Sequence, residues 1–498
     1  MCRVSMLLEA DWVLPIGGPP IADGALLVAD GTIGAVGPAG ELRARYPGAQ
    51  VRPFPGCALL PGLVNTHTHL EYSAFLDFFR PCGFGEWMLR LLLARRKLDS
   101  EDYGVSALWG AYECARSGVT SIGDTSFWGW TTARAAGAAG LRARVYLEAF
   151  GLDDAELPAT MERLEARLAG LQSECGARVE AGLSPHAPYT VSARLYREVA
   201  RYGRRKGLRL ATHVAESLAE VELLEQGTGA IAQAYRAANM WKGRRWKPPG
   251  TSPVVYVART HALGPRTLAV HCVQIGDGDV AALAESGTPV AHCPRSNLRL
   301  QCGSAPVMKL LKAGITVGLG TDSLGSNESL DMFAEMRAAL AVSRARASRG
   351  ARASSDPTSA ASVGAFGAAP SLEEGAPAGG LSETAVLRMA TLDGARALGW
   401  DHLAGSLEKG KRADIIAVRL PVDASATRGT LRGSDPIGAL VREATAADVT
   451  MTMVDGTVIF TRPQPQEGEL PHADDLGEVG RAFAAVRTKL GLNDRPGG

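Results

Sequence analysis

The sequence has no apolar run that approaches the ~20 residues required by a membrane-spanning helix. It also has almost no net charge, +1 over 498 residues, so nothing marks it as a nucleic-acid or membrane-surface binder. The N-terminal segment reaches the acidic residues Glu9 and Asp11 too early for a secretory signal peptide. We therefore expect a cytoplasmic protein that acts on a small molecule, with no nucleic-acid or membrane partner.

The eight cysteines include no C-x-x-C pair and are scattered over the chain. This spacing is typical of reduced intracellular thiols and argues against a disulfide framework. Hydrophobic residues make up 46% of the chain and charged residues 21%, which is the composition of a globular protein with a sizeable core.

Both ends of the chain have the texture of short β-strands. Asp-Gly turn signals occur at Asp23-Gly24, Asp30-Gly31 and Asp455-Gly456, next to short apolar runs. The simplest interpretation is one small β-sandwich domain, built from both terminal segments around an inserted larger domain. The predicted parts are 1–56 (first β part), 57–400 (inserted domain), 401–465 (second β part) and 466–498 (helical tail).

The inserted domain alternates short apolar strands with helical patterns. An eightfold β/α alternation favours a closed parallel barrel over an open sheet, so we predict an α/β fold, a TIM-like (β/α)8 barrel with the smaller β-sandwich. The eight predicted strands are Ala58–Val64, Thr120–Gly123, Ala143–Phe150, Val179–Leu183, Arg209–Thr212, Leu268–Val270, Pro289–Ala291 and Thr316–Gly320.

Two stretches interrupt this alternation, residues 228–262 and 344–381. The second is rich in Ala, Ser, Gly and Pro, a composition typical of a surface insertion. The first contains Trp241, Arg244, Arg245 and Trp246, either a substrate lid or a basic exposed insertion. A helix is expected to begin after Ser382, and an amphipathic helix near 478–490 is expected to pack on the protein's own surface.

Histidines collect at the predicted strand ends. His67 and His69 are two residues apart, so a strand would aim both imidazoles at one point. Alone, this pair could equally be ordinary polar residues of a loop. However, the same placement recurs for six of the nine histidines, and in a barrel the C-terminal strand ends meet at one mouth. The six are His67, His69, His186, His213, His271 and His292.

Asp322 follows the eighth predicted strand, which a barrel closes against the first. A buried carboxylate is costly unless it is paired or binds a metal. With His67, His69 and His213 it would offer three nitrogens and one oxygen to one divalent ion, Zn²⁺ or Fe²⁺. Its alternative role is a helix N-cap. Glu216, three residues after His213, could reach a substrate, or could simply be an acid favoured by a helix dipole.

These residues together resemble the amidohydrolase superfamily. The motifs are PGLVNTHTHLE (61–71), SPHAPYTVS (184–192), THVAES (212–217), VHC (270–272), HCPRSNL (292–298) and GTDSLGSNESLDM (320–332). The sequence looks most similar to the branch that contains adenosine-type, S-adenosylhomocysteine and aminofutalosine deaminases and triazine hydrolases. No lysine stands at the end of the fourth strand, where Ser184-Pro185-His186 lies instead, and this favours one metal ion.

The resemblance implies a hydrolytic deaminase that uses a metal ion to activate water. Asp322 and His271 would take a proton from that water, and Glu216 would pass a proton to a ring nitrogen as ammonia leaves. His292 would help to orient the water. The predicted substrate contacts are Glu71, Glu86, Trp87, His186, His292 and Asn297.

Several functions fit this resemblance. The first hypothesis is an aminofutalosine deaminase of menaquinone biosynthesis, because the loop after the first strand is similar. S-adenosylhomocysteine or methylthioadenosine deamination and triazine-type chloride hydrolysis are alternatives. A non-catalytic barrel that only binds partners is a hypothesis of another class. The family resemblance also implies a possible homodimer.

Overall fold

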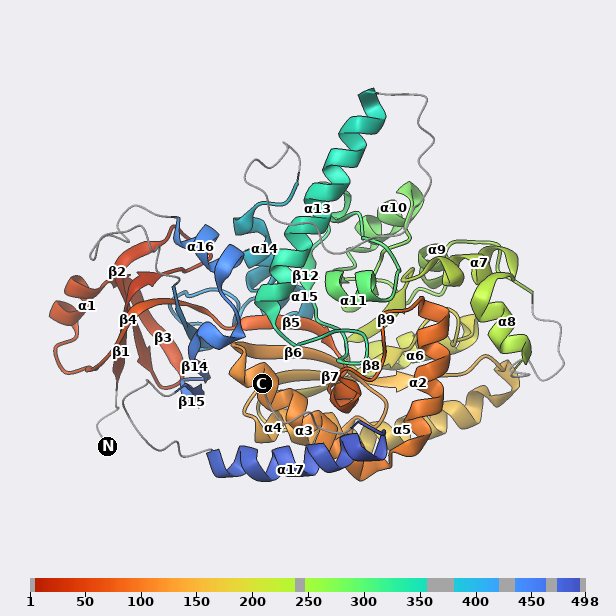
Figure 1. Ribbon diagram of the computed structural model, residues 1–498, viewed down its shortest axis with the longest axis horizontal. Helices are drawn as coiled ribbons and strands as arrows, with labels where there is room; N and C mark the ends of the chain where they lie inside the picture. Colours follow the sequence, from red (N-terminus) through yellow and green to blue (C-terminus); the bar gives the residue numbers. More distant parts are fainter. Residues whose placement is uncertain (1–4, 238–246, 356–379, 421–434, 463–472, 493–498) are drawn as a thin grey trace.

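The computed structural model describes residues 5–237, 247–355, 380–420, 435–462 and 473–492. These residues form two β-sheets with helices around them (Figure 1). Strands from the two ends of the chain, red and blue in Figure 1, lie together at the left of the view. The second sheet lies to their right and is built from the middle of the chain.

The smaller sheet has seven strands in the order β15-β14-β13-β4-β1-β2-β3. All its neighbouring strands are antiparallel except β1 and β4. Its hairpin turns fall at Asp30-Gly31 and Asp455-Gly456, all four with the positive φ that such turns require. Asp23-Gly24, by contrast, lies inside β2. The strands are β1 Met6–Val13, β2 Ile21–Ala29, β3 Thr32–Pro38, β4 Gln50–Pro61, β13 Ile415–Arg419, β14 Val449–Val454 and β15 Thr457–Thr461.

The larger sheet has eight parallel strands in sequence order, as predicted. One predicted strand is divided, because Ala58–Pro61 ends β4 of the smaller sheet and the barrel begins only at Leu63. The predicted fold class, a TIM-like barrel with a smaller β domain, is confirmed. The eight strands are β5 Leu63–Thr68, β6 Val119–Ser126, β7 Arg142–Ala149, β8 Val179–Pro185, β9 Leu210–Val214, β10 Thr267–His271, β11 Val290–His292 and β12 Val317–Leu319.

Side chains close the seam between the first and last barrel strands. The Thr66 hydroxyl donates to the Leu319 carbonyl at 2.7 Å. Asn65 bonds Thr321 twice, donating to its hydroxyl and accepting from its backbone N–H at 3.0 Å. Glycines permit this approach, since a Cβ on Gly318 would lie 2.4 Å from the Thr66 Cγ2 atom. The seam therefore fixes β12, and the residues after it, beside His67.

Helices surround the barrel and follow its strands (Figure 1). They are α2 Phe84–Ala94, α3 Ser100–Arg116, α4 Trp130–Ala138, α5 Leu157–Ser173, α6 Ala193–Lys206, α7 Leu218–Gln226, α8 Gly229–Ala237, α9 Pro253–Ala258, α10 Asp277–Ser286, α11 Pro294–Arg299, α12 Val307–Lys312, α13 Met332–Ser355, α14 Glu383–Met389 and α15 Leu392–Leu398. The smaller sheet carries α1 Ala39–Arg45, and α16 Pro436–Glu443 packs against α13 and α14. Ser382 caps α14 as predicted, accepting from the Ala385 N–H.

The predicted C-terminal helix is α17, Ala473–Lys489. It packs on the protein's own surface beside α3, at the bottom of Figure 1. Phe483 stacks on Trp109 with ring centroids 4.6 Å apart, and Val486 and Leu490 are buried in the same cluster. This confirms the predicted packing of the apolar stripe.

The two interrupting stretches are only partly described. The first contains α8 and α9, and α13 runs into the second as far as Ser355. Trp241, Arg244, Arg245 and Trp246 lie outside the described residues, as do residues 356–379. No helix in the described ranges is both long and apolar enough to cross a membrane.

Gly318→Ala tests the seam. We expect the free energy of unfolding to fall by about 1–3 kcal/mol, because the new methyl group overlaps the Thr66 side chain. Denaturant unfolding measures the change. Gly170→Ala in α5 is the control, since no described atom lies within 4 Å of its added Cβ, and it should stabilise by about 0.5–1 kcal/mol. Equal stabilities of the two variants would contradict the seam's role.

Candidate active site

A bulge in the first barrel strand directs the two neighbouring histidines. Between Asn65 and Thr68, β5 carries one residue more than the segment of β6 that it faces, Ile122 to Asp124. Such a bulge re-aims the side chains next to it. His67 and His69 are both buried, with ring centroids 4.8 Å apart. The strand end thus presents both imidazoles to the same space.

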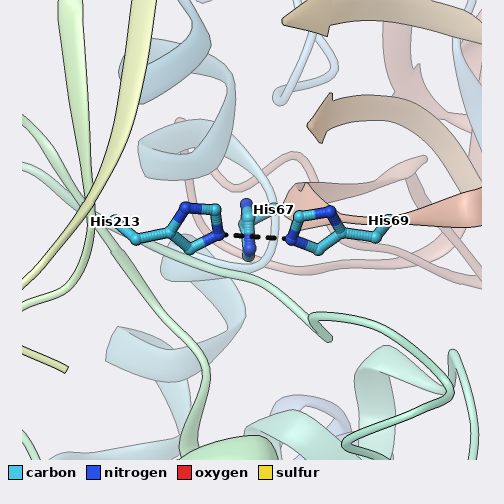
Figure 2. Close-up of side chains that lie close together, drawn as sticks. All are labelled: His67, His69 and His213. Carbon is cyan, nitrogen blue, oxygen red and sulfur yellow. Dashed lines mark hydrogen bonds between the residues drawn. The ribbon is translucent and has the colours of Figure 1, made fainter. Parts of the chain in front are cut away.

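His213, from β9, completes a cluster of three imidazoles. Its Nδ1–H donates to the His186 carbonyl at 3.0 Å, which leaves the lone pair on Nε2. That Nε2 atom faces the His69 Nε2 atom at 3.2 Å, as the dashed line in Figure 2 shows. The His67 ring lies between them in that view. Its own Nε2 atom is buried and has no hydrogen-bond partner among the described residues.

Asp322 lies next to this cluster and comes from the residues after β12. Its Oδ1 atom is 3.6 Å from the His67 Nε2 atom and 3.7 Å from the His69 Nε2 atom. Hydroxyls of Ser296 and Ser326 donate to Oδ2 at 2.6 and 2.8 Å. Burial alone would raise the pKa of this carboxyl, but the neighbouring histidines, His67 foremost, hold its pKa well below the usual range. Asp322 is therefore an ionised carboxylate inside the protein.

The four side chains form a donor set for a divalent ion. Burial lowers the pKa of His69 to about 3, and burial with neighbouring imidazoles lowers the pKa of His213 well below its usual value. Both rings are thus neutral at physiological pH and offer lone pairs, as metal ligation requires. Three nitrogens with one carboxylate suit Zn²⁺ or Fe²⁺. The unpaired Nε2 atom of His67 is explained if an ion is its partner.

A second group of acidic and basic side chains adjoins the first. Glu216, His271 and Asp322 place ligand-type atoms within 4.8 Å of one another. Burial, reinforced by the charges of Asp322 and Glu220, raises the pKa of Glu216 well above its usual value. Burial therefore favours the protonated form of the Glu216 carboxyl. This is the property of a general acid.

Two further residues hold this group in place. Glu220 accepts the backbone N–H groups of Ala215 and Glu216 at 3.1 and 2.9 Å, which fixes the turn that carries Glu216. Asn297 accepts from the His271 Nδ1–H at 2.9 Å, so the His271 Nε2 lone pair faces Glu216 Oε1 at 3.6 Å. The left-handed backbone of His271, with φ of 75°, aims its ring.

A cavity of about 410 Å³ opens beside both groups. His69, His213, Glu216, His271 and Asp322 are among its lining residues. Most of its wall is apolar or aromatic and comes from α2, η1 (the 3₁₀ helix Leu70–Phe75), α8 and the loops after β6, β7 and β8. The wall includes Tyr72, Phe84, Trp87, Met88, Leu91, Leu92, Phe127, Phe150, Tyr189 and Tyr235, and its polar members include Arg95, Glu148 and His186.

The predicted substrate contacts divide into two sets. Trp87 and His186 line this cavity, as expected for substrate contacts. Glu71, Glu86, His292 and Asn297 are not among the lining residues. Each has another contact in the structure, and a substrate role for any of the six residues stays a prediction.

Glu71 is buried, and its carboxylate accepts four hydrogen bonds from the loop after β6, from Ser126, Phe127, Trp128 and Thr131. It therefore shapes that loop through both carboxylate oxygens. Glu86 points outward, 54% exposed, and pairs with Arg90 one helical turn away. Asn297 holds His271, and His292 is completely buried.

Arg95, Glu148 and Glu220 were not predicted from the sequence. Glu148 sits in a strand pattern that reads as ordinary barrel core, and Arg95 follows a helix with other arginines nearby. Glu220 offered one signal, since it stands three residues after the N-cap Ser217. A carboxylate at that place is typical of a helix start.

Comparison with known proteins decides the family. A model described as "Amidohydrolase family" matches residues 58–374 and 359–459. The chain belongs to the amidohydrolase family. This confirms the predicted resemblance, and the protein is a hydrolase of carbon–nitrogen bonds other than peptide bonds. A second model, an imidazolonepropionase-like composite domain of bacteria, matches residues 24–49.

Similar proteins include the 5-methylthioadenosine/S-adenosylhomocysteine deaminase of Moorella thermoacetica. It is 32% identical over 461 residues, which are 92% of this chain and 94% of that protein. The 5′-deoxyadenosine deaminase of Methanothermobacter thermautotrophicus is 32% identical over 98% of this chain and 100% of its own. Among solved structures, a zinc-bound adenosine deaminase from Xanthomonas campestris superposes with a TM-score of 0.75, at 25% identity, covering 97% of this chain and 99% of that one.

His213→Asn tests the ion site. We expect purified wild-type protein, loaded with Zn²⁺ and dialysed, to retain close to one ion per chain by mass spectrometry, and the variant to lose it. The reason is that His213 supplies one of the three imidazole nitrogens that lie within 4.8 Å of one another. His261→Asn is the matched control, because His261 is exposed and lies outside the cluster. Equal metal content in both variants would contradict the assignment.

Proposed function

We propose that this amidohydrolase deaminates an adenosine-like nucleoside by hydrolysis. The observation that carries the proposal is the position of Glu216, a carboxyl whose pKa is raised by burial, beside the buried side chains of His67, His69, His213 and Asp322 on the wall of a largely apolar cavity. Deamination of an adenine ring needs these parts, an activated water and a proton donor for the ring nitrogen. The deaminase names of relatives that match nearly the whole chain support it.

Each side chain of the two groups has a task in this reaction. A divalent ion held by His67, His69, His213 and Asp322 would supply an acidified water at neutral pH. Glu216 holds a proton on its carboxyl and gives it to the ring nitrogen beside the carbon under attack. The Nε2 lone pair of His271 faces Glu216, and Asn297 accepts from its Nδ1–H. His271 accepts a proton on the side where Glu216 lies. Asp322 is ionised before the reaction and can accept a second proton.

The cavity wall favours a nucleoside whose 5′ substituent is uncharged. Trp87, Phe84 and Tyr189 offer flat faces for a purine. Met88, Leu91 and Leu92 add aliphatic surface suited to a methylthio or methyl group. This chemistry agrees with 5′-methylthioadenosine and 5′-deoxyadenosine as substrates.

Arg95 favours a second candidate with a carboxylate on the substituent. Its guanidinium lies over the rings of Tyr72 and Phe127, 5.7 and 5.0 Å from their centroids, on the cavity wall. A carboxylate could pair with it in bidentate geometry. S-adenosylhomocysteine and aminofutalosine both carry one, so the predicted aminofutalosine deaminase remains this second candidate.

Glu216→Gln tests the proposed chemistry. We expect ammonia release from 5′-methylthioadenosine or 5′-deoxyadenosine to fall by about 10²–10⁴-fold, because an amide cannot give up the proton that the ring nitrogen needs. Coupled ammonia detection measures the rate with metal-loaded protein. Glu225→Gln, an exposed residue on α7, should be unchanged. A panel with aminofutalosine, S-adenosylhomocysteine and a chloro-s-triazine ranks the substrates, and silence across the aminated nucleosides would overturn the proposal.

Arg95→Met separates the two substrate candidates. If a carboxylate binds Arg95, kcat/KM for S-adenosylhomocysteine or aminofutalosine should fall by about tenfold or more, while that for 5′-methylthioadenosine stays within about twofold. Arg96→Met, an exposed neighbour, is the control. Equal losses on charged and uncharged substrates would remove Arg95 from substrate recognition.

A further inference from the structure

The C-terminal helix α17, at the bottom of Figure 1, contacts an element of the candidate active site as well as α3. That element is η1, Leu70–Phe75, which directly follows the proposed ion ligand His69. From α17, Phe483 and Val486 share one apolar cluster with Tyr72 of η1. Tyr72 also lines the cavity. The end of the chain therefore packs behind a segment of the cavity wall.

Side chains from two other elements hold the two ends of η1. At its start, the Leu70 N–H donates to the carboxylate of Asp124 in β6 at 2.7 Å. At its end, Arg487 of α17 donates to the Leu76 carbonyl at 2.7 Å and to the Ala74 carbonyl at 3.4 Å. The last carbonyls of a helix have no partner within it and need donors from elsewhere. Arg487 therefore fixes the end of η1, as Asp124 fixes its start.

Between these two contacts, Tyr72 connects η1 to the proposed ion site. Its ring stacks on the His69 ring, with centroids 5.5 Å apart and the two planes 20° from parallel. Its backbone N–H donates to the His69 carbonyl at 3.0 Å. Because a stacked neighbour fixes the plane of an imidazole, the orientation of His69 depends on where η1 holds Tyr72.

His69 differs from His213 in how its ring is oriented. The Nδ1–H of His213 donates to the His186 carbonyl at 3.0 Å. Within the described ranges, the Nδ1 atom of His69 makes no such hydrogen bond, and the stacked ring of Tyr72 takes its place. Contacts that orient a ligand from behind are worth about 10- to 100-fold in metal affinity. The stack is thus the contact through which η1 can act on the ion site.

We propose that Arg487 is a positioning residue for the ion site, and that it acts on His69 through Tyr72. The inference rests on the proposed function, because that reaction needs an ion at His69, and it gives the C-terminal helix a part in holding this ion. Lys489 offers a comparison on the same helix. It pairs with Asp102 at 2.6 Å and so connects α17 to α3.

The test measures the Zn²⁺ dissociation constant of the full-length, metal-stripped protein by competition with a chelator. Arg487→Met keeps an unbranched side chain and removes the donors. We expect its dissociation constant to rise about tenfold and the visible absorption of its Co²⁺ form to change, because His69 is less well oriented. Arg487→Lys, which keeps a charged donor, should recover part of the loss. Lys489→Met is the matched control and should bind Zn²⁺ as wild type does.

A double-mutant cycle tests the route through Tyr72. Tyr72→Leu removes the stacked ring and should weaken Zn²⁺ binding about tenfold, whereas Tyr72→Phe keeps the ring and should stay within about twofold of wild type. Once the ring is gone, Arg487 has nothing left to position. In the Tyr72→Leu background, Arg487→Met should therefore change the dissociation constant by less than about twofold.

Three results would overturn the inference and leave the proposed function standing. They are equal Zn²⁺ affinities of wild type and Arg487→Met, equal losses in Arg487→Met and Lys489→Met, and full additivity of the Arg487 and Tyr72 losses. The second result would mean that α17 acts only by docking on α3. A wild type that binds no Zn²⁺ would instead contradict the proposed function, and the inference with it.

Discussion

The buried carboxylate of Asp322 is the constraint on which the rest of the site depends. It lies at the seam between the first and last barrel strands, and its backbone N–H donates to the His67 carbonyl at 3.0 Å. A charge in this position is tolerable only with donors and cations around it. Two serine hydroxyls supply donors, and the imidazoles of His67, His69 and His213 complete a site for a cation. The side-chain bonds that close the seam therefore also assemble the proposed ion site.

Local departures from regular backbone aim the other groups. A bulge directs His67 and His69, and left-handed residues direct His271 and Asp322, with φ of 75° and 58°. Such conformations cost free energy and persist where the surrounding structure fixes them. The surroundings then separate the two neighbouring carboxyls, because burial raises the pKa of Glu216, whereas the histidines beside Asp322 lower its pKa. Glu216 can therefore serve as the acid while Asp322 stays ionised.

The barrel and the histidine cluster could be predicted because alternation and strand ends are local signals in the sequence. His67, His69 and His213 converge for that reason. The roles of Glu71 and Asn297 could not be predicted, because each depends on partners distant along the chain. These partners are the loop after β6 for Glu71 and His271 for Asn297. The junction at Pro61–Leu63 was missed because β4 and β5 form one apolar run, divided only by Gly62. Glu148 was missed because one acid in a buried strand gives no pattern.

Hydrolytic deamination is the central claim, and isotope labelling tests it most directly. Metal-loaded protein would be incubated with 5′-deoxyadenosine or 5′-methylthioadenosine in water enriched in oxygen-18. The account predicts one ammonia released per product molecule and one oxygen-18 atom in the purine ring substituent, read by mass spectrometry. Product formed without ammonia or without solvent oxygen, or no reaction of either nucleoside with an ion-loaded site, would contradict it.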